Sequence, residues 1–225
     1  MLTRAMETSP PQTFRIERLG PASPAARFQQ LAKLHVESIH GGIMEALGPH
    51  FLASLYEQLS RRSEVLMYAA RRDQQTIGFV AATINLMDSL KNIGVVGLVR
   101  LALAGAANLW RPRMLKKVFQ TAGYFFRRID SGDTARLIED ASDPERSELL
   151  AIAVAEDARG QGIGTSLVDA LEKDFQNRCG RHEYFVSTNR DEIGSNAFYR
   201  AAGFTLVGQK RHHDLMLNVY KRELE

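Results

Sequence analysis

Hydrophobic residues along the chain recur with two spacings, which separate predicted strands from predicted helices. A short alternating run over residues 14–19 predicts a strand, and the apolar residues between 28 and 35 recur at helical spacing. The same reasoning predicts strands at residues 14–19, 65–70, 76–86, 149–154, 184–187, 204–207 and 215–220, and helices at residues 24–35, 43–59, 163–175 and 195–202. Strands and helices are interleaved without an internal repeat, which predicts an α/β fold with a mixed sheet.

One long segment interrupts this pattern, at about residues 87–145. Its first part is rich in Leu, Ala and Val with scattered Arg, and it predicts one or two helices broken near Arg111-Pro112. Its last part, residues 132–145, is polar and typical of a loop. We therefore expect a flexible tail at residues 1–12 and a single domain at residues 13–225 that carries this helical insertion.

Composition narrows the class of protein. The chain has 225 residues, of which 44% are hydrophobic and 24% charged, as in globular proteins rather than disordered ones. Cys179 is the only cysteine, so an intrachain disulfide and a zinc site built from several thiolates are excluded. The first twelve residues contain no apolar segment typical of a signal peptide. We expect a reducing, cytoplasmic setting.

Charge is concentrated in the insertion. Residues 89–129 contain eight Lys and Arg but no Asp or Glu, so this segment carries +8 while the whole chain carries +3. Three interpretations are open: a helical flap over the sheet, attraction of an anionic acceptor, or peripheral contact with an anionic membrane. A transmembrane span does not fit, because Lys91 and Arg100 interrupt the apolar run and Pro112 ends it.

A glycine-rich turn follows the apolar strand at residues 149–154. Gly160, Gly162 and Gly164 lie just before an amphipathic helix, where free N–H groups and the helix dipole form an anion site. A pyrophosphate would fit this turn, with Arg159 adding positive charge. The alternative is a tight strand-to-helix connection without a ligand. The spacing matches neither a Walker A loop nor the dinucleotide-binding Gly-x-Gly-x-x-Gly motif.

Two motifs together resemble a known family. Residues 159–164, Arg-Gly-Gln-Gly-Ile-Gly, resemble the Gln/Arg-x-x-Gly-x-Gly/Ala signature with which the GNAT N-acetyltransferases bind the pyrophosphate of acetyl-CoA. Residues 195–204 resemble the second signature of that family, a short helix ending in Phe-Tyr-x-x-x-Gly-Phe. The resemblance covers nearly all of the chain except about residues 87–145. It implies a mixed, mostly antiparallel central sheet flanked by helices, with acetyl-CoA as co-substrate. We expect no metal site, because the adjacent His212 and His213 would point to opposite faces of a strand.

The resemblance also assigns binding roles. The strand before the turn would pair its backbone with the pantetheine arm, and a backbone N–H near Val154 would polarise the thioester carbonyl. Asn189 and Asn196 would hydrogen-bond the pantetheine or adenosine, although Glu192 stands where the family usually has an asparagine. The residues that the resemblance assigns to the cofactor are Ile152, Ala153, Val154, Arg159, Gly160, Gln161, Gly162, Ile163, Gly164, Thr165, Asn189 and Asn196.

Two residues are candidates for proton transfer. Tyr199 matches the family tyrosine that hydrogen-bonds the sulfur and acts as general acid; the alternative is a core aromatic residue beside Phe198 and Phe204. Glu148 matches a position where several members carry the glutamate that deprotonates the amine through water. The alternative for Glu148 is an exposed acid at a strand end. Glu156 lies nearer the turn and is a poorer candidate for the base.

These residues imply an acetyl-CoA-dependent N-acetyltransferase that acts by direct transfer to a primary amine in a ternary complex. The acceptor would be an amino sugar or another small amine, and the basic insertion favours one that carries phosphate. A catalytically inert acetyl-CoA sensor and a basic module for nucleic acid or membrane surfaces are the alternatives. We expect no nucleic acid as partner, because no recognition motif accompanies the basic residues. A homodimer through the C-terminal strands is common in the family.

Overall fold

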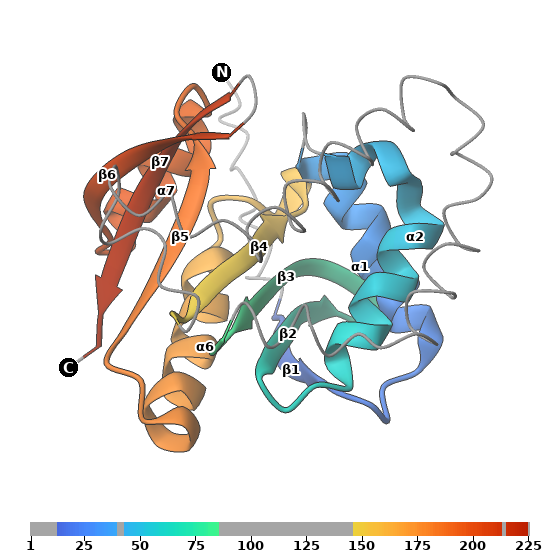
Figure 1. The fold of residues 1–225 in the computed structure, drawn as a ribbon. Helices are drawn as coiled ribbons and strands as arrows, with labels where there is room; N and C mark the ends of the chain where they lie inside the picture. Colours follow the sequence, from blue (N-terminus) through green and yellow to red (C-terminus); the bar gives the residue numbers. More distant parts are fainter. Residues whose placement is uncertain (1–12, 40–42, 86–145, 213–214, 225) are drawn as a thin grey trace, which may run out of the picture.

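The computed structural model describes residues 13–39, 43–85, 146–212 and 215–224. In this part of the chain seven strands form one sheet in the order β1-β2-β3-β4-β5-β7-β6 (Figure 1). Neighbouring strands are antiparallel, except that β4 and β5 are parallel. The predicted α/β fold with a mixed, mostly antiparallel sheet is thus confirmed. The predicted tail at 1–12 and the whole of the predicted insertion at about 87–145 lie outside the described residues.

The predicted helices and strands outside the insertion are present. In chain order they are β1 (Arg15–Leu19), α1 (Ala25–Ser38), α2 (Ile43–Ser60), β2 (Val65–Arg72), β3 (Gln75–Thr83), β4 (Glu148–Val154), the 3-10 helix η1 (Glu156–Ala158), α6 (Ile163–Cys179), β5 (Glu183–Asn189), α7 (Ile193–Ala201), β6 (Thr205–His212) and β7 (Leu215–Glu223). The predicted break in α2 is at Gly48, whose φ is 84°. The predicted strands at 65–70 and 76–86 leave a longer connection than the structure has. Asp73 adopts a positive φ that closes a two-residue hairpin between β2 and β3.

Helices cover the two faces of the sheet. One apolar cluster joins α1 and α2 to β2 and β3, through residues such as Phe28, Leu52 and Phe79. The other joins α6 and α7 to the opposite face, through residues such as Leu167 and Tyr199. Because both faces of β2 and β3 are covered, these strands are almost continuously buried rather than alternating. The sheet thus has an α1/α2 face and an α6/α7 face.

The sheet separates in its middle, between β4 and β5. Only two residue pairs join these two described strands, Glu148 with Phe185 and Leu149 with Val186. In β4, Leu150 is an extra residue, since Ala82 pairs with Leu149 while the preceding residue of β3 pairs with Ala151. Such a bulge bends a strand and increases its twist. Residues 150–154 therefore have no partner in β5, and we call the point of separation after Leu149 the β4–β5 fork.

Candidate active site

The glycine turn leads into α6 with the geometry that an anion site requires. Gly160 and Gly162 have φ values of 74° and 75°, a left-handed conformation that disfavours residues with a Cβ atom. Gly162 is the N-cap of α6; it has no side-chain cap, and the first turn holds no acidic residue. The first bond inside this helix runs from the Ser166 N–H to the Gly162 carbonyl at 3.0 Å, so the three preceding N–H groups have no partner within the helix. The turn fits a phosphate group.

Two further glycines bring the neighbouring elements close to this turn. A Cβ atom on Gly164 would lie 2.8 Å from the Phe198 ring, so the start of α6 touches α7. A Cβ atom on Gly78 of β3 would lie 3.0 Å from Ile163 Cγ2. Of the residues predicted to bind the cofactor here, Ile163 is buried and can offer its backbone only, whereas Thr165 is exposed.

Three polar side chains surround the turn. Arg159 Nε donates to the Val154 carbonyl at 3.2 Å. Gln161 Nε2 donates to the Asp157 carbonyl at 3.2 Å, and Gln161 Oε1 accepts a hydrogen bond from Arg72 Nη2 at 2.6 Å. Arg72 is the last residue of β2, so the hairpin places a second guanidinium beside the turn. The sequence offered no local signal for Arg72, because 89 residues separate it from Gln161.

The predicted pantetheine-binding residues lie on β4 beyond the fork. Ala153 is buried, whereas Ile152 and Val154 are partly exposed. Their backbones pair with β3 on one side and do not pair with β5 on the other. This is the side on which a ligand could extend the sheet. The pantetheine contacts and the polarising N–H near Val154 stay predictions.

Glu148 lies at the fork in a buried polar cluster. Its carboxylate Oε1 lies 3.4 Å from Arg146 Nη2 and accepts a hydrogen bond from Ser187 Oγ at 3.2 Å. The Arg146 guanidinium also lies over the Phe185 ring, 4.8 Å from its centre. Glu148 is only 8% exposed, so it is not the exposed strand-end acid of the alternative interpretation. The cluster fixes one carboxylate oxygen, and the other accepts no hydrogen bond from the described residues.

Tyr199 is buried on α7 in a cluster of aromatic rings. The nearest rings are those of Phe198, Phe204 and Tyr220, with centres 5.3 to 5.8 Å away. Burial raises the pKa of Tyr199, so its hydroxyl keeps its proton near neutral pH. This hydroxyl makes no hydrogen bond with the described residues. Tyr199 is thus part of the core, and its hydroxyl remains a candidate proton donor.

Glu148 and Tyr199 lie at the same level of the sheet. Tyr199 packs on Tyr220, whose partner in β5 is Val186, and Val186 in turn pairs with Leu149 beside Glu148. Leu149 faces the cluster of α6, so Glu148, one residue earlier, points to the α1/α2 face. Tyr199 belongs to the α6/α7 face. The two predicted proton-transfer residues therefore stand on opposite faces of the sheet at the level of the fork.

The two predicted asparagines have internal partners. Asn196 is 3% exposed, and its Nδ2 lies within hydrogen-bond distance of the carbonyls of Asn189, Arg190 and Glu192. Its Oδ1 accepts hydrogen bonds from Asn218 Nδ2 at 2.7 Å and from the Tyr220 hydroxyl at 2.9 Å. The structure thus gives Asn196 the role of joining α7 to β5 and β7, and its contact with a cofactor stays a prediction. The Asn189 side chain accepts a hydrogen bond from the Asp191 N–H and is partly exposed.

The described residues give little support for a cysteine nucleophile, a metal site or a membrane-spanning helix. Burial, and secondly the nearby Asp174, raise the pKa of the Cys179 thiol, which disfavours the nucleophilic thiolate. In the described ranges there is no group of three or more His, Cys, Asp or Glu side chains that could hold a metal ion. None of the helices described is long and apolar enough to cross a membrane.

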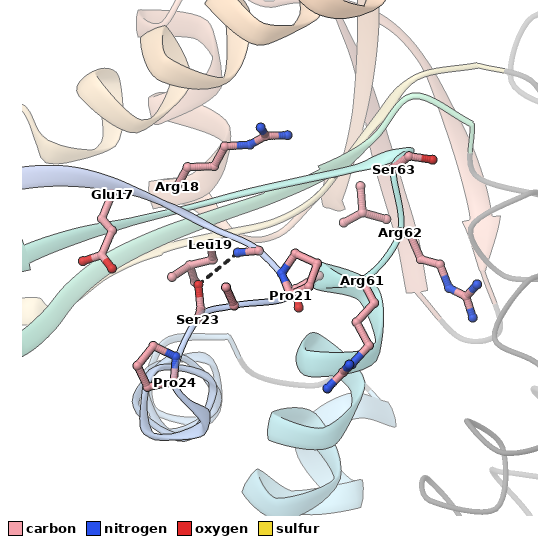
Figure 2. Close-up of a pocket in the computed structure, with 13 residues that line it drawn as sticks. Glu17, Arg18, Leu19, Pro21, Ser23, Pro24, Arg61, Arg62 and Ser63 are labelled. Atoms are coloured by element: carbon pink, nitrogen blue, oxygen red, sulfur yellow. Dashed lines mark hydrogen bonds between the residues drawn. The ribbon is translucent and has the colours of Figure 1, made fainter.

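A cavity of about 560 Å³ lies at the opposite end of β2 from the glycine turn, between the β1–α1 and α2–β2 connections. Figure 2 shows that the side chains of Arg18 and Arg62 extend away from each other. Arg18 pairs with Asp174, and Arg61 pairs with Glu57. Since these arginines do not converge on a common point, we assign no ligand to this cavity.

Comparison with known proteins gives one family match and several similar folds. The chain matches the acetyltransferase (GNAT) family over residues 30–204. The fold is similar to the ribosomal-protein-S18-alanine N-acetyltransferase of Escherichia coli, with a TM-score of 0.54, 11% identity and 94% of each chain covered. It is also similar to Arabidopsis thaliana NAA60 in complex with acetyl-CoA, with a TM-score of 0.55, 14% identity and coverage of 94% of this chain and 99% of that one. No curated protein matches the chain by sequence.

At these identities the solved structures establish a common fold, while the family match covers most of the chain. The uncapped glycine turn, the bulged β4 and the β4–β5 fork are the features of the described residues that suit an acetyl-CoA site. The chain therefore belongs to the GNAT family of acetyltransferases, which use acetyl-CoA.

Proposed function

We propose that this protein transfers the acetyl group of acetyl-CoA directly to a primary amine, within a ternary complex of enzyme and both substrates. The observation that carries the proposal is the position of Glu148 and Tyr199 at one level of the sheet, on opposite faces of the β4–β5 fork. A thioester held along β4 would then have a carboxylate on one side and a phenol on the other.

The chemistry divides between these two residues. Glu148 accepts a proton from the amine, directly or through a water molecule, as the nitrogen attacks the thioester carbonyl. The new C–N bond forms, the C–S bond breaks, and the departing sulfur takes the Tyr199 proton. Arg146 and Ser187 hold one oxygen of Glu148, which leaves the other for the proton. Burial raises the pKa of Tyr199, so its hydroxyl is protonated when the sulfur departs.

Direct transfer agrees with the position of the only thiol. Cys179 is the last residue of α6, a helix of 17 residues that begins at the turn. At about 1.5 Å per residue the helix is roughly 25 Å long, so Cys179 lies far from the start of α6. Burial also raises the pKa of this thiol, which disfavours the thiolate that would have to take up the acetyl group.

The proposed acceptor is an amino sugar or another small amine. The basic residues of 89–129 favour an acceptor that carries phosphate, because cations raise the local concentration of an anionic substrate. Peripheral contact of this segment with an anionic membrane is the second interpretation. A protein amino terminus is a different acceptor class, and the Escherichia coli neighbour is an alanine N-acetyltransferase of a ribosomal protein.

The test is release of free CoA thiol from acetyl-CoA in a panel of amines: amino sugars with and without phosphate, polyamines and short peptides. We expect turnover with at least one amine and initial-velocity lines that intersect, as ternary-complex kinetics require. Glu148→Gln should lower kcat about a hundredfold or more, while Glu156→Gln serves as the exposed control. Binding of acetyl-CoA without turnover on any amine would favour the sensor, and an isolated acetyl-enzyme would refute direct transfer.

A further inference from the structure

We propose that Arg72, at the end of β2, binds a phosphate group of acetyl-CoA, and that Gln161 positions its guanidinium. This inference rests on the acetyl-CoA site and adds to it a residue from outside the glycine turn. It makes the β2–β3 hairpin part of cofactor recognition.

Gln161 holds Arg72 against the turn. The Gln161 amide is fixed at its nitrogen by the Asp157 carbonyl, which leaves its oxygen to accept the 2.6 Å hydrogen bond from Arg72 Nη2. The hairpin itself is anchored to the same region. The Ala155 N–H donates to the Ile77 carbonyl at 2.9 Å, and Gly78 lets the first turn of α6 approach β3 closely. The position of the Arg72 guanidinium is therefore set by the backbone before the glycine turn, through Gln161, and by the backbone of the β2–β3 hairpin.

Arg72 has spare donors and no acidic partner. A guanidinium carries five N–H donors, and Gln161 uses one of them. Arg72 Nε is buried without a hydrogen-bond partner, and no ion pair joins Arg72 to an acid in the described residues. By contrast Arg71, its neighbour in β2, is paired with Glu17 at 3.3 Å. A phosphate would supply the negative charge and the acceptors that Arg72 lacks.

The acidic residues beside the turn favour a second cation there. Glu156 and Asp157 of η1 lie just before the turn, and Arg159 is the only cation within it. Without Arg72 the acids outnumber the cations at the place where an anion must bind. Arginine also matches phosphate geometry, because it can donate two parallel hydrogen bonds to one group.

The test is calorimetric titration with acetyl-CoA and with its 3′-dephospho form. Arg72→Gln should weaken the binding of acetyl-CoA about ten- to a hundredfold, and Arg72→Lys should lose less because it keeps the charge. Arg62→Gln is the matched control, since Arg62 also has a buried Nε without a partner but lies beside the cavity at the far end of β2. Melting curves for each variant check that the fold is kept.

The two ligands separate the two kinds of phosphate. A loss in Arg72→Gln that disappears with the dephospho ligand supports contact with the 3′-phosphate, and a loss that persists supports contact with the pyrophosphate. Gln161→Ala should give a smaller loss, and adding it to Arg72→Gln should cost little more. Equal affinities of wild type and Arg72→Gln for both ligands would overturn the proposal for Arg72 alone. Failure of the wild-type protein to bind acetyl-CoA would instead refute the proposed function.

Discussion

The ion pair between Arg146 and Glu148 allows stability and catalysis to be separated by mutation. The two side chains are only 5% and 11% exposed, and Arg146 Nη2 lies 3.4 Å from Glu148 Oε1. At an effective dielectric constant of about 20, unit charges at this distance attract each other by about 5 kcal/mol. This attraction is offset by the cost of removing both charges from water, so the pair adds little net stability. Losing one partner alone is expected to be costly.

Glu148→Leu should therefore destabilise the protein by about 3–5 kcal/mol, because it leaves a buried guanidinium without its carboxylate. Arg146 would keep only its contact with the Phe185 ring, since its Nη1 already has no partner among the described residues. The double variant Arg146→Met/Glu148→Leu buries no charge, and apolar replacement of a buried pair is often neutral or stabilising. We expect the double variant to lose less than about 2 kcal/mol.

Urea unfolding followed by circular dichroism measures the free energy of unfolding, and CoA thiol release measures kcat. Both the single and the double variant should lose about a hundredfold or more in kcat, because the base is absent from each. Glu156→Gln should change neither quantity. A double variant as unstable as Glu148→Leu would refute the ion-pair reasoning. Wild-type kcat in the double variant would refute Glu148 as the base.

Other features of the site give predictions of the same kind. Gly164→Ala should lower the urea midpoint of unfolding. The gain in helix propensity of about 1 kcal/mol is outweighed by about 1–3 kcal/mol of overpacking against Phe198. The same substitution in a Phe198→Leu background should cost less stability, and equal costs in the two backgrounds would contradict this contact. Tyr199→Phe should lower kcat about a hundredfold and leave the affinity for acetyl-CoA in calorimetry unchanged. The free energy of unfolding should stay within about 0.5 kcal/mol of wild type, since the hydroxyl makes no hydrogen bond with the described residues. A loss of affinity would point to a binding role instead. Asn196→Ala should cost about 3 kcal/mol or more, because the buried Asn218 amide and Tyr220 hydroxyl of β7 lose the oxygen to which they donate. An unchanged melting temperature would disprove that role. Cys179 has a raised pKa, so its thiolate fraction at pH 8 is below that of free cysteine. Its alkylation by iodoacetamide should therefore be slower than that of free cysteine at pH 8, and the alkylation rate should continue to rise at higher pH. Cys179→Ser should keep full activity.

Local features of the sequence predicted the fold class and the glycine turn correctly. Gly160 and Gly162 adopt the left-handed conformation for which glycine is suited, and the apolar periodicity marked α6 and its buried face. The β4–β5 fork could not be predicted from local features of the sequence. It depends on the bulge at Leu150, which is defined only by the register of β4 against β3.

The environment of each candidate residue was decided by the tertiary structure. The proximity of Arg146 to Glu148 could have been predicted from the sequence, because residues two positions apart in a strand lie on the same face. Ser187 and Arg72 were not, since they come from other strands and meet their partners only after the sheet has formed. Gly164 was assigned to the cofactor by its motif, whereas the structure shows that it also makes room for Phe198.

The sequence by itself determined the order of strands and helices and the position of the glycine turn, and its two motifs predicted the GNAT family. These follow from backbone conformation and from periodicity, which act over a few residues. The tertiary structure alone decided that Glu148 is paired and buried, that Asn196 is held by internal hydrogen bonds, and that Arg72 stands beside the turn. Those facts depend on side chains that are distant along the chain, and only packing brings them together.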